Sequence, residues 1–160
     1  MSWLALPITC LALASLSDAI PAKKVSAVQN MVFNEASMKL LGFLEGRWSG
    51  TAPDGSIFYE AYDRPDALTL RSRRYKDARF VEETDGSIVS LKDGQITSTW
   101  GKYVWRATGV SDGFASFEPV NAPSAFAWRR IDRDTVEVTQ KWTDEKGLAQ
   151  SYALELRRVR

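Results

Sequence analysis

The chain has 160 residues, which suits one domain, because two domains would each be small for an independent core. Lys and Arg number 21 against 20 Asp and Glu, and the formal net charge of +1 argues against a dedicated nucleic-acid-binding protein. The absence of histidine excludes catalytic triads that use histidine, zinc sites with histidine ligands and haem held by histidine.

The first residues predict a signal peptide. Residues 1–16 read MSWLALPITCLALASL, an apolar run without charged side chains that is short for a membrane span. Residues 17–19, Ser-Asp-Ala, then place small residues at the −3 and −1 positions of a cleavage site. We therefore expect residues 1–19 to be cleaved, and the mature protein to be periplasmic or secreted with no membrane attachment. The alternatives are a membrane anchor, a buried apolar segment or a lipoprotein joined to lipid through Cys10.

Cleavage after Ala19 changes the chemistry of the chain. Removal of 19 residues from 160 leaves 141, and the loss of Asp18 leaves 21 basic and 19 acidic residues, a net charge of +2. It also removes Cys10, the only cysteine, so the mature chain has no disulfide, no cysteine nucleophile and no thiolate metal site. We expect a fold held by its core, with no metal and no cofactor.

Residues 20–44 are predicted to form a leader and a short helix. The leader contains Pro21-Ala22-Lys23-Lys24, and the helix is expected to begin after Asn34, which is a favourable N-cap residue. The apolar face of this helix is predicted to consist of Leu40, Leu41, Phe43 and Leu44, and Gly46 is expected to end it.

Residues 45–160 read as a series of short strands. Turn signals recur at 53–55, 64–66, 85–86, 93–94, 112–113, 132–134 and 144–147, several of them Asp-Gly, which favours tight hairpins. The segments between them are rich in aromatic and β-branched residues and are predicted strands: 48–52, 56–62, 68–75, 79–84, 87–91, 95–100, 103–110, 114–120, 125–131, 135–143 and 149–159. Such short links favour an all-β, antiparallel up-and-down β-barrel of about 8–10 strands, because closure hides the strand edges.

Two short motifs support this fold by resemblance. Residues 41–51 read LGFLEGRWSGT and residues 154–160 read LELRRVR. Together they resemble the calycin superfamily (lipocalins, fatty-acid-binding proteins and nitrobindin-like barrels), with the closest likeness to uncharacterised bacterial barrels that have an FLxGxW start. The resemblance implies that a basic residue of the last strand, Arg157 or Arg158, closes one end of the barrel over Trp48. Nitrobindin-like barrels also imply haem bound through histidine, which this chain lacks.

Alternation along the strands predicts an aromatic interior. In 135–143, for example, Val136, Val138, Gln140 and Trp142 alternate with polar residues. The same alternation makes Leu68, Leu70 and Ser72 inward-facing. The residues predicted to line a pocket for a small hydrophobic molecule are Phe58, Leu70, Trp105, Phe126, Trp128, Arg130, Gln140, Trp142 and Tyr152. Glu60, Arg130 and Gln140 are the predicted orienting groups, and the alternative is an interior filled by its own side chains.

A second hypothesis is a cofactor-free isomerase, cyclase or lyase. With no histidine, acid-base chemistry on an apolar substrate would fall to Glu60 or Glu118, with Tyr62 or Tyr103 stabilising negative charge. Exposed or ion-paired strand carboxylates are the alternative interpretation of both glutamates.

A third hypothesis is a structural or interaction barrel without a ligand. Under every hypothesis the protein is expected to be a monomer or a homodimer. The basic residues Arg71, Arg73, Arg74 and Lys76 lie among acidic neighbours, which indicates a solvated outer face rather than a nucleic-acid surface.

Overall fold

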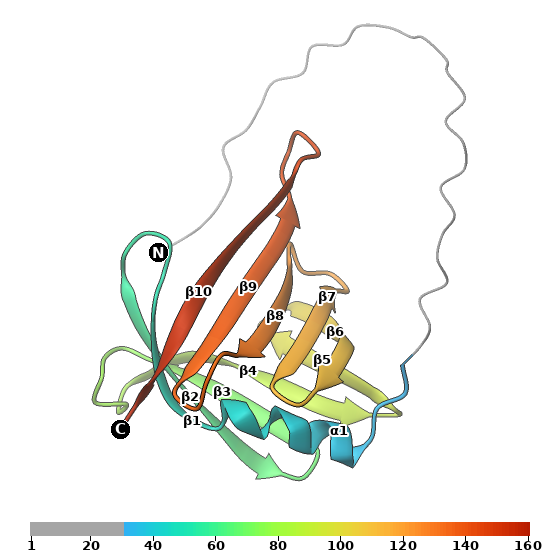
Figure 1. Ribbon diagram of the computed structural model, residues 1–160, viewed down its shortest axis with the longest axis horizontal. Helices are drawn as coiled ribbons and strands as arrows, with labels where there is room; N and C mark the ends of the chain where they lie inside the picture. The colour runs from blue at the N-terminus through green and yellow to red at the C-terminus, as the bar shows by residue number, and fades with distance from the viewer. Residues whose placement is uncertain (1–30) are drawn as a thin grey trace, which may run out of the picture.

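The chain forms one closed antiparallel barrel of ten strands in the computed structural model, which describes residues 31–160 (Figure 1). The predicted signal peptide, Cys10 and most of the leader lie outside the described residues. The strands are β1 (Gly46–Thr51), β2 (Ile57–Asp66), β3 (Thr69–Tyr75), β4 (Glu83–Lys92), β5 (Gln95–Trp100), β6 (Tyr103–Ser111), β7 (Phe114–Pro119), β8 (Ala125–Arg130), β9 (Thr135–Thr143) and β10 (Ala149–Val159).

Each strand pairs with its neighbours in the sequence, and the sheet closes between β1 and β10 from Arg47↔Val159 to Gly50↔Leu156. The predicted fold class, an all-β up-and-down barrel with a short N-terminal helix, is therefore confirmed. Neither of the helical segments within residues 31–160 has the length and apolar character needed to span a membrane.

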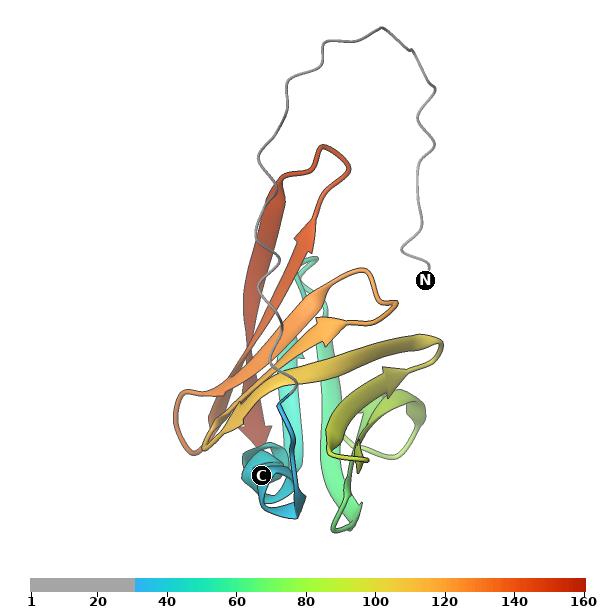
Figure 2. The same ribbon diagram turned by 90° about the vertical axis from the view of Figure 1, so that its right-hand side faces the viewer.

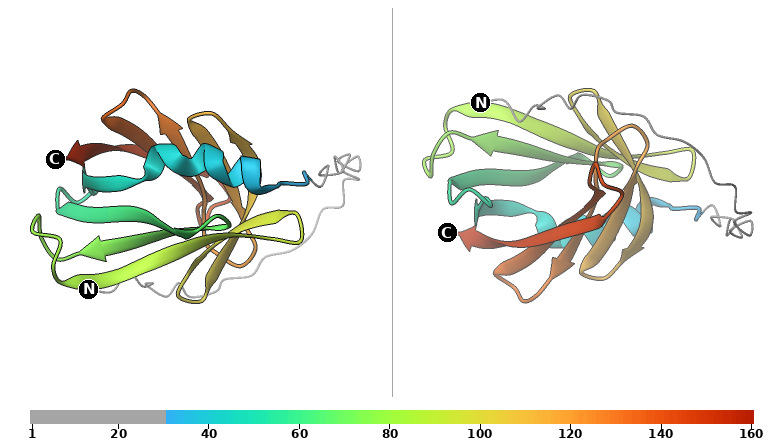
Figure 3. Two further views of the ribbon diagram at one scale, coloured as in Figure 1. Left: turned by 90° about the horizontal axis from the view of Figure 1, so that it is seen from below. Right: turned by 90° about the horizontal axis from the view of Figure 1, so that it is seen from above.

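The helix lies across one end of the barrel (Figure 3, left). It consists of α1 (Glu35–Leu40), followed by the 3-10 turn η1 (Leu41–Leu44). Asn34 caps it as predicted, because its side-chain oxygen accepts a hydrogen bond from the Ser37 N–H at 3.1 Å. Met38, Leu41 and Leu44 are fully buried against the strands, so the helix closes this end.

One part of the helix prediction was wrong. Leu40 is exposed, and Met38 occupies the buried position instead. Met38 and Leu41 lie three residues apart, which places them on one side of the chain, whereas Leu40 faces solvent. Arg64 fixes the helix to the barrel, since its guanidinium donates to the Met38 carbonyl oxygen at 3.1 Å.

The turn predicted at Asp85-Gly86 is also wrong, and this is why eleven predicted segments became ten strands. Both residues lie inside β4, where Gly86 pairs with Arg73 of β3. A Cβ atom on Gly86 would lie 2.3 Å from the Ser72 carbonyl oxygen, so glycine permits close approach of the two backbones. By contrast, Asp93 and Gly94 both have positive φ, 49° and 74°, as a tight hairpin turn requires.

The two ends of the barrel differ in burial. We call the end covered by α1 and η1 the closed end, and the opposite end, where β9 joins β10, the open end. Along β10, Leu156 is fully buried near the closed end, whereas Leu154 and Tyr152 on the same face are only half-buried. Val136 and Val138 of β9 differ in the same way. Solvent therefore reaches inward-facing side chains at the open end, beyond which the β9–β10 hairpin projects (Figure 2).

Candidate functional site

Strand register decides which side chains share the barrel interior, because directly paired residues of neighbouring strands point to the same face. Trp48 of β1 pairs with Glu60 of β2, which pairs with Arg74 of β3. Continued around the barrel, this register places on one face all nine residues of the predicted pocket together with Glu60 and Tyr62. Leu68 is an exception among the residues predicted to face inward, because it lies in the exposed β2–β3 turn.

An aromatic cluster crosses this interior. The rings of Phe117 and Phe126 are stacked, with centroids 4.7 Å apart, and Trp128 meets both edge-on at 5.4 and 4.9 Å. Trp105 extends the cluster on one side, 5.6 Å from Phe126, and Tyr62 extends it on the other, 6.0 Å from Trp128. Such edge-to-face contacts hold planar groups at defined angles, so these rings form a rigid apolar wall.

A polar cluster of Glu60, Tyr62 and Arg74 adjoins the aromatic wall. The Tyr62 hydroxyl donates a hydrogen bond to a Glu60 carboxylate oxygen at 2.9 Å. Arg74 Nε lies 3.6 Å from the other carboxylate oxygen, which is an ion pair but longer than a hydrogen bond. The Glu60 side chain is only 8% exposed, whereas that of Arg74 is 44% exposed. The cluster therefore runs from the buried interior toward solvent at the open end.

Burial determines the electrostatics of this cluster. Desolvation raises the pKa of Glu60, an effect that the positive charge of Arg74 and the Tyr62 hydrogen bond oppose. Burial also raises the pKa of Tyr62 well above its ordinary value, and the nearby Glu60 charge adds to the rise. Tyr62 therefore stays protonated and remains a hydrogen-bond donor. Because its pKa is raised, Glu60 takes up a proton more readily than an ordinary glutamate does. Chemically, the pair can orient a polar group or exchange a proton.

The predicted outer-face position was wrong for Arg74 and right for its neighbours. Arg71 and Arg73 point outward, where both pair with Asp63, at 2.7 and 2.8 Å. Arg74 points inward instead, and its guanidinium lies 4.9 Å from the Phe58 ring and 5.8 Å from the Trp100 ring. The signal was available in the sequence, because the inward alternation of Leu70 and Ser72 continues to position 74.

Sequence reasoning also missed Trp100 and Phe117. Trp100 ends β5 in the inward alternation of Ile96 and Ser98, and it is 43% exposed beside Arg74. Phe117 is 1% exposed and contacts two other rings of the cluster. The signal was available in the sequence, because Ala115 and Phe117 alternate with polar residues in β7, as the predicted inward-facing residues do in the other strands.

The remaining predicted pocket residues divide between the two ends. Leu70 is fully buried in the core. Phe58, Gln140, Trp142 and Tyr152 are half-buried, and the rings of Trp142 and Tyr152 meet at 5.7 Å. The interior is thus filled with side chains near the closed end and reached by solvent at the open end.

Three predicted residues do not join the polar cluster. Glu118 is exposed, so only one of the two predicted catalytic glutamates is in the interior. Tyr103 lies beside Trp105, with the Lys102 ammonium 5.5 Å from its ring. Arg130 reaches the closed end, where it binds Asp112 at 2.7 Å. There it lines a depression of about 390 Å³ together with Phe43, Asp132, Arg133 and Arg158.

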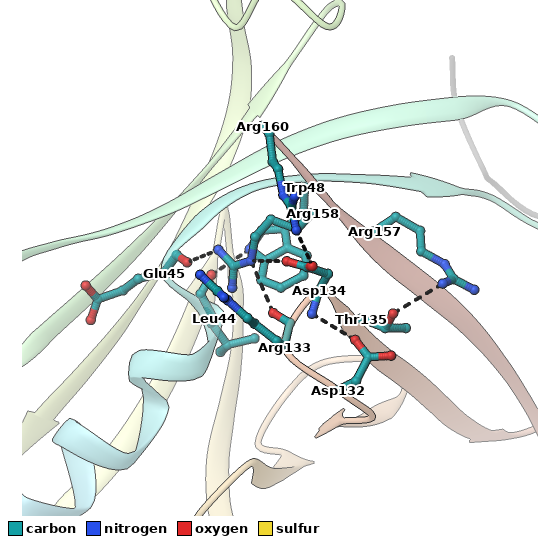
Figure 4. A network of polar contacts seen from close by, with 10 residues as sticks. All are labelled: Leu44, Glu45, Trp48, Asp132, Arg133, Asp134, Thr135, Arg157, Arg158 and Arg160. Atoms are coloured by element: carbon teal, nitrogen blue, oxygen red, sulfur yellow. Dashed lines mark hydrogen bonds and ion pairs between the residues drawn. The ribbon is translucent and has the colours of Figure 1, made fainter.

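Trp48 and Arg158 close the barrel, as Figure 4 shows. The Arg158 guanidinium lies 4.1 Å from the Trp48 ring centroid and donates to the Glu45 carbonyl oxygen at 2.8 Å. Trp48 Nε1 donates to the Leu44 carbonyl oxygen at 2.6 Å. Arg157 was the other residue considered for this position, but alternation turns it to the outer surface, where it contacts Thr135.

This arrangement explains the Gly-x-Trp-x-Gly pattern. Gly46 has φ of 121°, and a Cβ atom there would lie 2.3 Å from an Arg158 guanidinium nitrogen. At Gly50 a Cβ atom would lie 2.5 Å from the Phe58 ring. The two glycines therefore make room for Arg158 and Phe58 on either side of Trp48, which is a structural role. Residues 31–160 contain no group of three or more Cys, Asp or Glu side chains placed to hold a metal ion.

Comparisons with known proteins find only distant structural likeness. No protein-family model matches the chain, and no curated protein matches its sequence. Among solved structures, it is similar to "Structure of a redesigned beta barrel, b11L5F_LGL", with a TM-score of 0.36 and 12% identity, over 76% of this chain and 96% of that chain. It is also similar to "Structure of EF1p2_mFAP2b bound to DFHBI", with a TM-score of 0.40 and 13% identity, over 77% and 99% of the two chains. Such distant likeness carries no argument about function.

Proposed function

We propose that the open end of the barrel binds a small, largely apolar or aromatic molecule that carries a polar group. The observation that carries this proposal is the buried Glu60–Tyr62 pair, which adjoins an aromatic wall and an end of the barrel that solvent reaches. Burial of a carboxylate costs stability unless it is well paired, and its pairing with Arg74 is loose, at 3.6 Å. A polar cluster retained at such a cost is typical of a binding or catalytic site.

The residues present specify the ligand chemistry. Trp128 and Phe126 offer ring faces and edges to an apolar or aromatic body. Arg74 can donate hydrogen bonds to the polar group of the ligand, because 44% of its side chain is exposed.

The test begins with native mass spectrometry of protein purified from its own host, which detects a retained small molecule. Quenching of tryptophan fluorescence with a library of lipids and aromatic compounds then gives affinities. Arg74→Ala is expected to weaken binding at least about tenfold, since it removes a charged hydrogen-bond donor. Arg73→Ala on the same strand is the matched control, because it alters only the outer face. Equal affinities for the two variants, or no ligand at all, would contradict the proposal.

A second candidate function is acid-base catalysis on an apolar substrate without a cofactor. It is favoured by one observation, the raised pKa of the buried Glu60 beside a tyrosine hydroxyl that stays protonated. If an isomerase, cyclase or lyase activity is found, Glu60→Gln should abolish it while ligand binding survives. Glu118→Gln, in an exposed carboxylate, should leave the activity unchanged.

We further propose that the protein is a calycin-like barrel that is exported to the periplasm or secreted. The FLxGxW start and the basic last strand support the first part, and the apolar residues 1–16 with a small-residue cleavage site support the second. Cell fractionation and N-terminal sequencing test export, because the mature chain should begin at Ile20. A cytoplasmic protein that retains Met1 would overturn it.

A further inference from the structure

Three serines form a small polar patch inside the barrel, on the neighbouring strands β3, β4 and β5. Ser72 of β3 pairs directly with Ser87 of β4, and Ser98 of β5 pairs with Val89, two residues further along β4. Ser98 also pairs with Trp105 of β6, which belongs to the aromatic wall. Directly paired residues share a face, so the three serines line the interior beside that wall. We call them the serine patch.

The hydroxyl of Ser98 is buried without a partner. Ser98 is only 3% exposed, and its side chain makes no hydrogen bond within residues 31–160. Its oxygen is not one of the unpaired side-chain atoms that are sealed from solvent, so space remains beside it. The indole N–H of the adjacent Trp105 donates elsewhere, to the Ser124 carbonyl oxygen at 2.6 Å. A buried hydroxyl costs stability unless it finds a partner, so a ligand group at this position would meet an unmet need.

Ser87 offers a second hydrogen-bond donor. Ser72 Oγ accepts from the Ser87 backbone N–H at 3.1 Å and lies 2.8 Å from Ser87 Oγ. Each hydroxyl has one hydrogen, and the bond between them uses one, so one hydrogen of the pair is free. Ser72 is 7% exposed whereas Ser87 is half-buried, so Ser87 is the hydroxyl that a bound molecule can reach.

The serine patch lies further inside the barrel than Arg74. Arg74 pairs with Asp85 of β4, and Ser87 follows Asp85 by two residues in the direction of the closed end. At the usual strand rise Ser87 is about 7 Å beyond the level of Arg74, and Ser98 about 13 Å. Across the ring of ten strands, β9 and β10 present apolar side chains that are half-buried, among them Val138 and Leu154.

Charges near the patch indicate which oxygen it suits. Arg74 is already paired with Glu60, so its positive charge is in part neutralised. Asp85, the charged residue nearest to Ser87 on the inner face of β4, is negative. A carboxylate or phosphate at the serine patch would therefore approach Asp85 with no cation beside it, which is unfavourable in a partly desolvated interior. Two serine hydroxyls instead suit an uncharged oxygen that accepts hydrogen bonds.

We propose that the molecule bound at the open end carries an uncharged acceptor oxygen, a ketone or hydroxyl oxygen, that accepts hydrogen bonds from Ser87 and Ser98. The inference rests on the proposed function, because it concerns the same ligand. Arg74 binds the polar group near the open end, the aromatic wall contacts the apolar body, and the serine patch recognises the second oxygen at the inner end. Ser98 is thereby a residue that determines specificity.

Two probes of nearly equal shape, 2-acetylnaphthalene and 2-ethylnaphthalene, test this inference, because they differ in a carbonyl oxygen. Tryptophan fluorescence quenching gives both affinities. Ser98→Ala should weaken binding of the ketone at least about fivefold and leave binding of the hydrocarbon unchanged or tighter, since it removes a hydrogen-bond donor but no apolar surface. Ser90→Ala is the matched control, because Ser90 lies on β4 but alternation turns it to the outer face. It should change neither affinity.

The possible failures of the experiment are distinguishable. Equal effects of Ser98→Ala on the two probes would overturn this inference alone. Ketone binding that is weakened by Arg74→Ala but not by Ser98→Ala would also overturn it, because the oxygen would then lie at the polar cluster, and the proposed function would stand. If the unaltered protein binds neither probe, the proposed function and this inference both fail.

Discussion

The closed and open ends of this barrel are built from the same strands but differ in what fills them. At the closed end, Met38, Leu44 and Leu156 are fully buried and Trp48 lies beneath the guanidinium of Arg158. At the open end, inward-facing side chains such as Tyr152 and Trp142 stay half-buried, and a carboxylate, a phenol and a guanidinium occupy the interior. Stability is thus concentrated at one end, which leaves the other free to carry chemistry that costs stability.

Tryptophan truncation should give the largest difference between the ends. Trp48→Ala removes a fully buried ring and its hydrogen bond, and should lower the free energy of unfolding by about 3–5 kcal/mol. Trp142→Ala, at a half-buried ring, should cost about 1 kcal/mol. Urea denaturation measures both. If Trp48→Ala does not fold, Trp48→Phe, at about 2 kcal/mol, serves in its place. Equal losses at the two positions would contradict the comparison.

Two leucines on β10 test the same difference in packing between the closed end and the open end. Leu156 and Leu154 share the inner face of β10, and the first is fully buried while the second is half-buried. Leu156→Ala should cost about 3 kcal/mol and Leu154→Ala about 1 kcal/mol, because only the first leaves a closed cavity. Chemical denaturation of the two variants should show this order, and a reversed order would mean that the open end is the better packed one.

Substitution of the adjacent residues Arg157 and Arg158 should give a smaller difference in stability than the leucine substitutions. Arg158→Met should cost about 2 kcal/mol, since it removes the hydrogen bond to the Glu45 carbonyl oxygen and the contact with Trp48. Arg157→Met alters an exposed side chain and should change stability by less than about 0.5 kcal/mol. A similar loss of stability in both variants would show that the positive charge of the side chain, rather than its position over Trp48, stabilises the barrel.

The pH dependence of stability gives the smallest and most specific effect. Burial raises the pKa of Glu60 in the fold, so its stabilising contribution is present below the ordinary glutamate value and is lost as the pH rises through the raised value. Glu60→Gln should remove this loss, so the variant should gain stability relative to the unaltered protein as the pH rises from the ordinary glutamate value through the raised pKa of Glu60. Urea midpoints across this range test it, with Glu118→Gln as the exposed control. A constant difference across the range would contradict a raised pKa.

Much of the fold could be predicted from alternation and turn residues, whereas the site could be predicted only in part. Strand parity placed Glu60, Tyr62 and Trp128 on one face, because side chains alternate strictly along a strand. Arg74 was missed because its neighbours Arg71 and Arg73 made the run look like one charged surface, although they face the opposite side. Contacts across the barrel, such as that of Tyr62 in β2 with Trp128 in β8, depend on which strands face one another, and local sequence does not show this.

The pairing of β1 with β10 has a consequence for how the chain acquires its fold. The hydrogen bond from Arg158 to Glu45 joins residues 113 positions apart. Such distant contacts make folding slow, because a long loop must be ordered before they form. β10 is the last of the ten strands to be synthesised, so the barrel cannot close before that strand has been made.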